Sequence, residues 1–63
     1  MPEYQERVIE EFEELENKIS KLEVFIKTDF YKTLETDEQE LLRDQLSYMH
    51  GYSTVLSERI ARF

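Results

Sequence analysis

The segment VIEEFEELENKISKLEVFI, residues 8–26, decides the fold of this 63-residue chain. Its apolar residues recur at alternating intervals of four and three, which is the spacing of a helix face that packs against another helix. These residues are Val8, Phe12, Leu15, Ile19, Leu22 and Ile26. The pattern predicts one long helix over residues 3–27. Pro2 precedes it, at a position where the missing N–H would have had no intrahelical partner.

A second helix is predicted over residues 37–62, after a connector over residues 28–36. The connector lacks a helical stripe and is rich in residues that bond their own backbone, so at most one helical turn is expected there. Thr36 and Gln39 match a capping box, in which each side chain bonds the backbone N–H of the other residue. The second apolar seam again follows intervals of four and three: Leu42, Leu46, Met49, Ser53, Leu56, Ile60 and Phe63.

These patterns predict an all-α protein, an antiparallel helical hairpin that forms a single domain over residues 1–63. A chain this short buries little of its surface, and without cysteine it has no disulfide to stabilise it. A second apolar row lies beside the seam of the later helix, while Ile9, Val24 and Phe25 flank the first seam. The second row consists of Leu41, Tyr48, Tyr52 and Val55. One hairpin cannot cover both rows, so we expect a homo-oligomeric helical bundle.

The charge balance excludes several classes of partner. Fifteen acidic residues outnumber eight Lys and Arg, and the net charge of −7 disfavours binding to DNA or to an anionic membrane surface. The longest apolar run is three residues, Val24 to Ile26, which is too short for a membrane span or a secretory signal. We therefore expect a cytoplasmic protein.

Residue types that carry catalysis are scarce. His50 is the only histidine, so neither a histidine metal cluster nor a Ser-His-acid triad with a spare base is available. The glutamates of residues 10–14 lack the Glu-x-x-His pairs of a di-iron bundle and are interpreted as a solvated face. We predict no enzymatic activity, no metal and no cofactor. Gly51 interrupts a strong helix at a cost of about 1 kcal/mol, which predicts a close approach to its backbone by a neighbouring helix or, less favoured, by a ligand.

The few cations occur in pairs one helical turn apart, Lys18 with Lys21 and Arg59 with Arg62. In an isolated hairpin the two arginines would lie beside the acidic residues 3–6, where surface ion pairs are the simplest interpretation. In an oligomer, symmetry brings the same cation from two or three subunits together and creates an anion pocket. Both interpretations remain open on the spacing alone.

Over nearly its whole length the chain resembles the phage anti-CBASS type 2 sponge family. The blocks KISKLEVF, residues 18–25, and ERIARF, residues 58–63, carry most of the resemblance. Members of that family are small helical proteins that form hexamers and sequester the cyclic di- and trinucleotide messengers of bacterial antiviral signalling without cleaving them. The resemblance implies the same fold, assembly and activity here, in the cytoplasm of an infected bacterium.

The resemblance also implies roles for four residues. Tyr4 would cover a base in a dinucleotide pocket between two subunits, and Lys18 would contact the phosphates of that ligand. Arg59 would contact a trinucleotide where three subunits meet, assisted by Ser20. Two other functions compete with sequestration: a helical adaptor that receives a partner helix on its second apolar row, and, more remotely, a metal-dependent phosphodiesterase.

Overall fold

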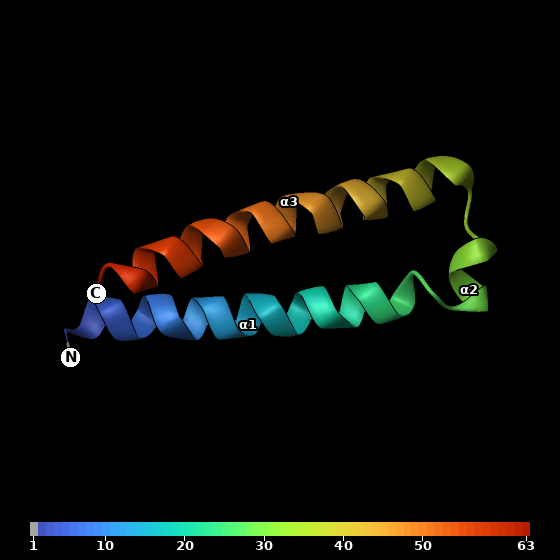
Figure 1. The fold of residues 1–63 in the computed structure, drawn as a ribbon. Helices are drawn as coiled ribbons and strands as arrows, with labels where there is room; N and C mark the ends of the chain where they lie inside the picture. The colour runs from blue at the N-terminus through green and yellow to red at the C-terminus, as the bar shows by residue number, and fades with distance from the viewer. Residues whose placement is uncertain (1) are drawn as a thin grey trace.

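The computed structural model describes residues 2–63, which form two long helices and one short helix (Figure 1). In chain order these are α1 (Glu3–Phe25), α2 (Asp29–Lys32) and α3 (Thr36–Ala61). The long helices α1 and α3 run antiparallel, so both ends of the chain lie at the same end of a rod of 46 × 15 × 13 Å. The predicted all-α fold, with two long helices and a short connector, is confirmed.

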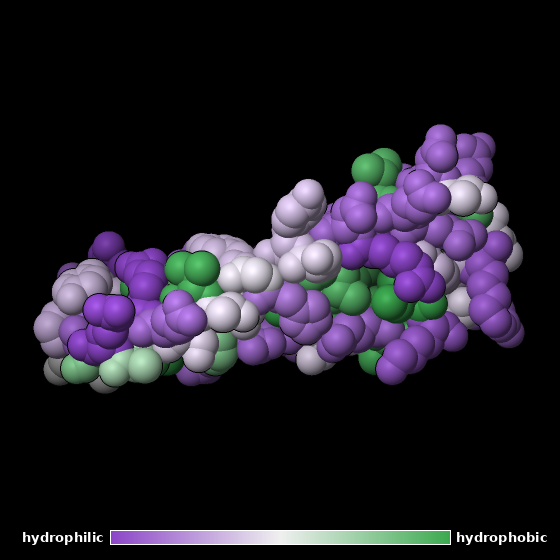
Figure 2. All heavy atoms as spheres, turned by 45° about the horizontal axis from the view of Figure 1, so that its top comes forward, coloured by the Kyte–Doolittle hydropathy of each residue, from purple (hydrophilic) through white to green (hydrophobic). Residues whose placement is uncertain are grey.

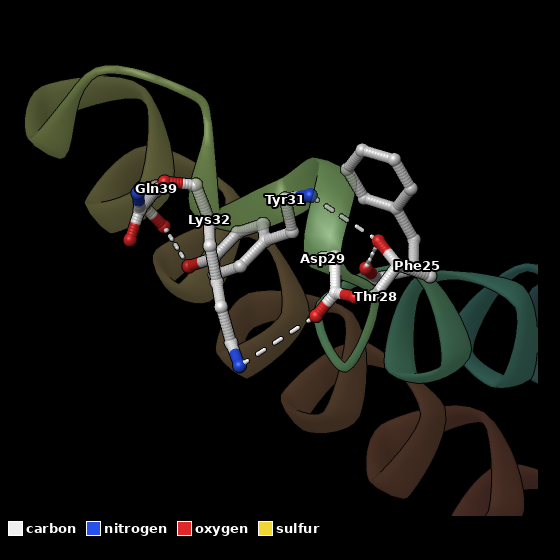
Figure 3. Close-up of polar contacts among 6 residues, drawn as sticks. All are labelled: Phe25, Thr28, Asp29, Tyr31, Lys32 and Gln39. Atoms are coloured by element: carbon white, nitrogen blue, oxygen red, sulfur yellow. Dashed lines mark hydrogen bonds and ion pairs between the residues drawn. The ribbon is translucent and has the colours of Figure 1, made fainter.

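The helix α1 ends two residues earlier than predicted, at Phe25, because Thr28 begins a new turn. The Thr28 hydroxyl donates a hydrogen bond to the Phe25 carbonyl at 2.7 Å and accepts one from the Tyr31 N–H at 3.2 Å (Figure 3). Thr28 is therefore the N-cap of α2, the four-residue helix inside the predicted connector. One side chain both closes α1 and starts α2.

The predicted capping box at the start of α3 is wrong. Thr36 is the first residue of α3, and Glu35 occupies the N-cap position without a side-chain hydrogen bond. The Gln39 amide instead donates to the carbonyl of Leu34 at 2.8 Å and to that of Lys32 at 3.4 Å. Carbonyls at a helix end lack intrahelical partners, and the end of α2 places its carbonyls within reach of Gln39.

The two predicted seams meet in the hydrophobic core. Val8, Leu15, Ile19 and Leu56 are buried, and four residues of the seams pack against them: Phe12, Leu46, Met49 and Ile60. Ser53 is the one buried polar residue in the described chain, and its hydroxyl donates to Glu16 Oε1 across the helices at 3.0 Å. Burial of apolar surface against the facing seam, at about 25 cal/mol per Å², holds the hairpin closed.

The helices α1 and α3 diverge toward the end occupied by α2 (Figure 1). Tyr31 of α2 is buried at this end and its hydroxyl donates to the Gln39 carbonyl at 2.9 Å (Figure 3). The same hydroxyl accepts from Arg43 Nε at 3.0 Å, and the Arg43 guanidinium lies 5.7 Å from the centre of the Tyr31 ring. Phe25 meets that ring edge-on at 6.1 Å. Tyr31 therefore ties the connector to both long helices.

Candidate functional site

A row of exposed apolar residues runs along α3 beside the core. Leu41, Tyr48, Tyr52 and Val55, here called the α3 strip, retain 62, 79, 45 and 52% of their accessible surface. This confirms that the hairpin leaves its second apolar row uncovered. In the space-filling view of Figure 2, apolar side chains interrupt a mostly hydrophilic surface, and some are recessed toward the α2 end. A shallow hollow of about 720 Å³ lies on α3 and is lined by Leu41, Asp44, Gln45, Tyr48, Met49 and Tyr52.

Tyr52 joins the α3 strip to α1. Its hydroxyl donates a hydrogen bond to the Glu11 carboxylate. That hydrogen bond is the largest cause of a raised pKa for Tyr52, with desolvation and the Glu11 charge acting in the same direction and the Arg59 charge opposing them. The hydrogen bond favours the protonated hydroxyl and links α3 to α1.

The four residues implied in ligand binding are all exposed, but one chain does not bring them together. Tyr4 lies at the paired ends of the hairpin, where its ring meets that of Phe63 edge-on at 5.9 Å. Lys18 follows Tyr4 by fourteen positions, which is about 21 Å along α1. Ser20 lies two residues beyond Lys18, so the two side chains leave α1 on nearly opposite sides. Arg59 lies in the last turn of α3.

Of the two open interpretations of Arg59 and Arg62, ion pairs with Glu3 or Glu6 do not form among residues 2–63. Glu3 pairs with Arg7 at 2.6 Å, because residues four apart share a face of the same helix. The ion pairs among residues 2–63 are Arg7–Glu3, Lys32–Asp29 and His50–Glu23. Lys18 and Arg59 are therefore exposed cations without a carboxylate partner in the part of the chain that the structure describes.

The surroundings of His50 and Gly51 are open. His50 is exposed, and its Nε2 atom lies 3.4 Å from Glu23 Oε2 on α1. A Cβ atom placed on Gly51 would meet nothing within 4 Å. The predicted close approach of a helix to Gly51 is therefore wrong within one chain.

Residues 2–63 offer neither a metal site nor a membrane-spanning helix. No group of three or more His, Cys, Asp or Glu side chains there is arranged to hold a metal ion. None of the three helices is both long and apolar enough to cross a membrane.

A helical hairpin with unpaired surface cations and an uncovered apolar strip has the surface of a small binding protein. Residues 2–62 match the Sequestin family, and the chain belongs to this family, whose name denotes sequestration. It is 42% identical over 60 residues to a 7.5 kDa protein of the denB–rIIB intergenic region of Enterobacteria phage T4, which covers 95% of this chain and 94% of the T4 protein. No solved structure matches the chain. These matches confirm the family resemblance seen in the sequence.

Proposed function

We propose that this protein binds and sequesters the cyclic di- and trinucleotide messengers of bacterial CBASS immunity without cleaving them, in the cytoplasm of a phage-infected bacterium. Membership of the Sequestin family is the observation that carries the proposal, and the relative in phage T4 supports the setting. The exposed, unpaired cations Lys18 and Arg59 supply the positive groups that a phosphate ligand needs.

Each implied residue has a chemical role in this function. The Lys18 ammonium binds the phosphates of a cyclic dinucleotide as a point charge, while the planar Arg59 guanidinium binds trinucleotide phosphates through paired N–H donors. Tyr4 is 58% exposed even beside Phe63, so its ring retains surface on which a base stacks. Ser20 adds a hydroxyl at the trinucleotide site.

The proposed pockets require more than one copy of the chain. Tyr4 and Lys18 are about 21 Å apart along α1, which exceeds the reach of one nucleoside, so a single dinucleotide bridges residues of different copies. Closed symmetry then supplies the same cation two or three times, and the resemblance favours a hexamer. A ligand held only by the assembled form also stabilises the assembly by mass action.

A retention experiment separates the candidate functions. The purified protein is incubated with cyclic di- and trinucleotides, freed of unbound ligand and heated, and the released material is analysed by mass spectrometry. Release of intact ligand is the expected result. Cleaved ligand would instead identify a phosphodiesterase. Absence of any retained ligand would favour the adaptor, whose α3 strip receives a helix of another protein.

Substitutions of Lys18 and Arg59, two of the exposed cations without an ion pair among residues 2–63, test the separate pockets. Loss of a charge-assisted hydrogen bond costs about 1.5–3 kcal/mol, so Lys18→Ala should weaken dinucleotide binding about 10- to 150-fold and leave trinucleotide binding intact. Arg59→Ala should do the reverse. Lys27→Ala and Arg62→Ala are the controls, since each removes the same charge from a position just beyond the end of α1 or α3. Sedimentation velocity should find all four variants assembled, and dissociation of both binding variants would show that these cations are structural.

A further inference from the structure

The α3 strip continues into charged residues of opposite sign at its two ends. Arg59 follows Val55 by four residues and therefore lies on the same face of α3. Asp37 precedes Leu41 by four residues and occupies that face at the other end. Both charged residues are exposed, and neither takes part in an ion pair within residues 2–63. The exposed face thus carries Asp37 at its start and Arg59 at its end, with the α3 strip and Asp44 between them.

We propose that the α3 strip docks on the same strip of a second copy, with the two α3 helices antiparallel. A parallel pair would place Asp37 beside the partner's Asp37 and Arg59 beside the partner's Arg59, which is repulsive. The antiparallel pair opposes unlike charges instead. The inference deepens the proposed function and rests on it for the role of Arg59.

One register places apolar residues opposite each other in the middle of the face and unlike charges opposite each other at its ends. When Leu41 lies opposite the partner's Val55, Tyr48 lies opposite the partner's Tyr48 on the two-fold axis. The same alignment sets Arg59 opposite the partner's Asp37. The partner's Tyr48 then covers Tyr48, the most exposed residue of the strip. The contact of Arg59 with Asp37 at each end is a surface pair that contributes little to the docking and that a phosphate ligand can replace. A two-fold pair with the same surface on both copies is the commonest symmetry among homo-oligomers.

The shape of the surface favours a helix over a small ligand as the occupant. All six residues that line the hollow belong to the single helix α3, so the surface follows the face of one helix and does not enclose a molecule. Side chains on such a face form ridges and grooves that a second helix fills. Gly51 follows Tyr48 by three residues and flanks the strip, and the open space beside it admits a side chain of the partner.

The docking has a consequence for the trinucleotide site. Arg59 lies eleven residues from Tyr48, about 16 Å from the two-fold axis, so the two Arg59 residues of one pair are about 33 Å apart. A single pair therefore presents its arginines at opposite ends. Contacts between pairs are needed to bring several Arg59 side chains to one ligand.

Cysteine cross-linking tests both the surface and the direction, since the chain has no cysteine of its own. Leu41→Cys and Val55→Cys proteins are mixed in equal amounts, oxidised gently and resolved by intact mass. The mixed disulfide should make up more of the disulfide dimers than the half that random pairing gives, and Tyr48→Cys alone should form a disulfide dimer. Thr54→Cys, exposed on another face of α3, is the control and should cross-link slowly. Excess Leu41→Cys and Val55→Cys homodimers, or cross-linking no faster than the control, would overturn the proposal.

Ligand retention by the same samples separates the two proposals. Retention is measured with one cyclic dinucleotide and one cyclic trinucleotide before oxidation. Retention without the mixed disulfide would reject the α3 docking and leave sequestration standing. The mixed disulfide without retention would reject sequestration and leave the docking standing.

Discussion

Replacement of Gly51 by alanine should stabilise the protein. Gly51 lies inside α3, far from either end, and its backbone φ is negative, so alanine fits the backbone without strain. A Cβ atom there meets nothing within 4 Å, so no steric term opposes the gain in helix propensity. Gly is less favourable than Ala inside a helix by about 1 kcal/mol, and that difference becomes the expected gain. For a domain of this size it corresponds to a rise in Tm of about 4–8 °C.

Urea unfolding followed by circular dichroism measures this gain at several protein concentrations. Ser47→Ala, at another exposed position of α3, is the matched control and should gain only about half as much. Absence of a gain for Gly51→Ala at the lowest concentration would refute the reasoning, because some group would then have to lie against the Gly51 backbone. A gain that shrinks as the concentration rises would place a second copy beside Gly51.

Three further substitutions test the core, the connector and the hydrogen bond of Tyr52 to Glu11 between α3 and α1. Leu56→Ala should lower the free energy of unfolding by about 2–5 kcal/mol in urea titrations, because Leu56 is fully buried, whereas Leu41→Ala on the exposed strip should cost far less at a protein concentration low enough to separate the copies. Tyr31→Phe should cost about 1 kcal/mol in the same assay, and a double variant with Arg43→Ala should be less destabilised than the sum, since the two residues share one hydrogen bond. The pKa of Tyr52 is raised above 10.0, so its protonated hydroxyl stabilises the fold fully below pH 10, and this stabilisation is lost as the pH rises through the raised pKa. The free energy of unfolding, measured across that pH range, should show the loss in the wild type and not in Tyr52→Phe.

Periodicity made the two long helices predictable. Apolar residues at intervals of four and three specify a helix face without reference to any other part of the chain, and residues of both predicted seams form the core. Phe63, the last residue of the second seam, is instead exposed. The exposed α3 strip was predictable for the same reason, because a hairpin can cover one row of each helix and no more. Tyr31 was missed, since its burial depends on where α2 lies and not on a repeat in the local sequence.

For the candidate ligand site, the sequence indicated the residues but not their arrangement in space. The resemblance named Tyr4, Lys18, Ser20 and Arg59, and the residue types alone indicated which of them suit phosphates or bases. Their separation within one chain, and the absence of an ion pair on Arg59 within residues 2–63, became visible only once α1 and α3 were placed side by side. Glu3 is nearer in sequence to Arg7 than to any arginine of α3, and the local pair forms.

The sequence by itself determined the helices, the faces that pack and the apolar row that remains outside, because each follows from local periodicity and charge. The tertiary structure decided the ends of the helices, the turn at Thr28, the buried Tyr31 hydroxyl and the Gln39 contacts that replace the capping box. These features depend on groups that are several residues apart in the chain and close in space. Only the packed hairpin settles which of the competing hydrogen-bond partners each polar group takes.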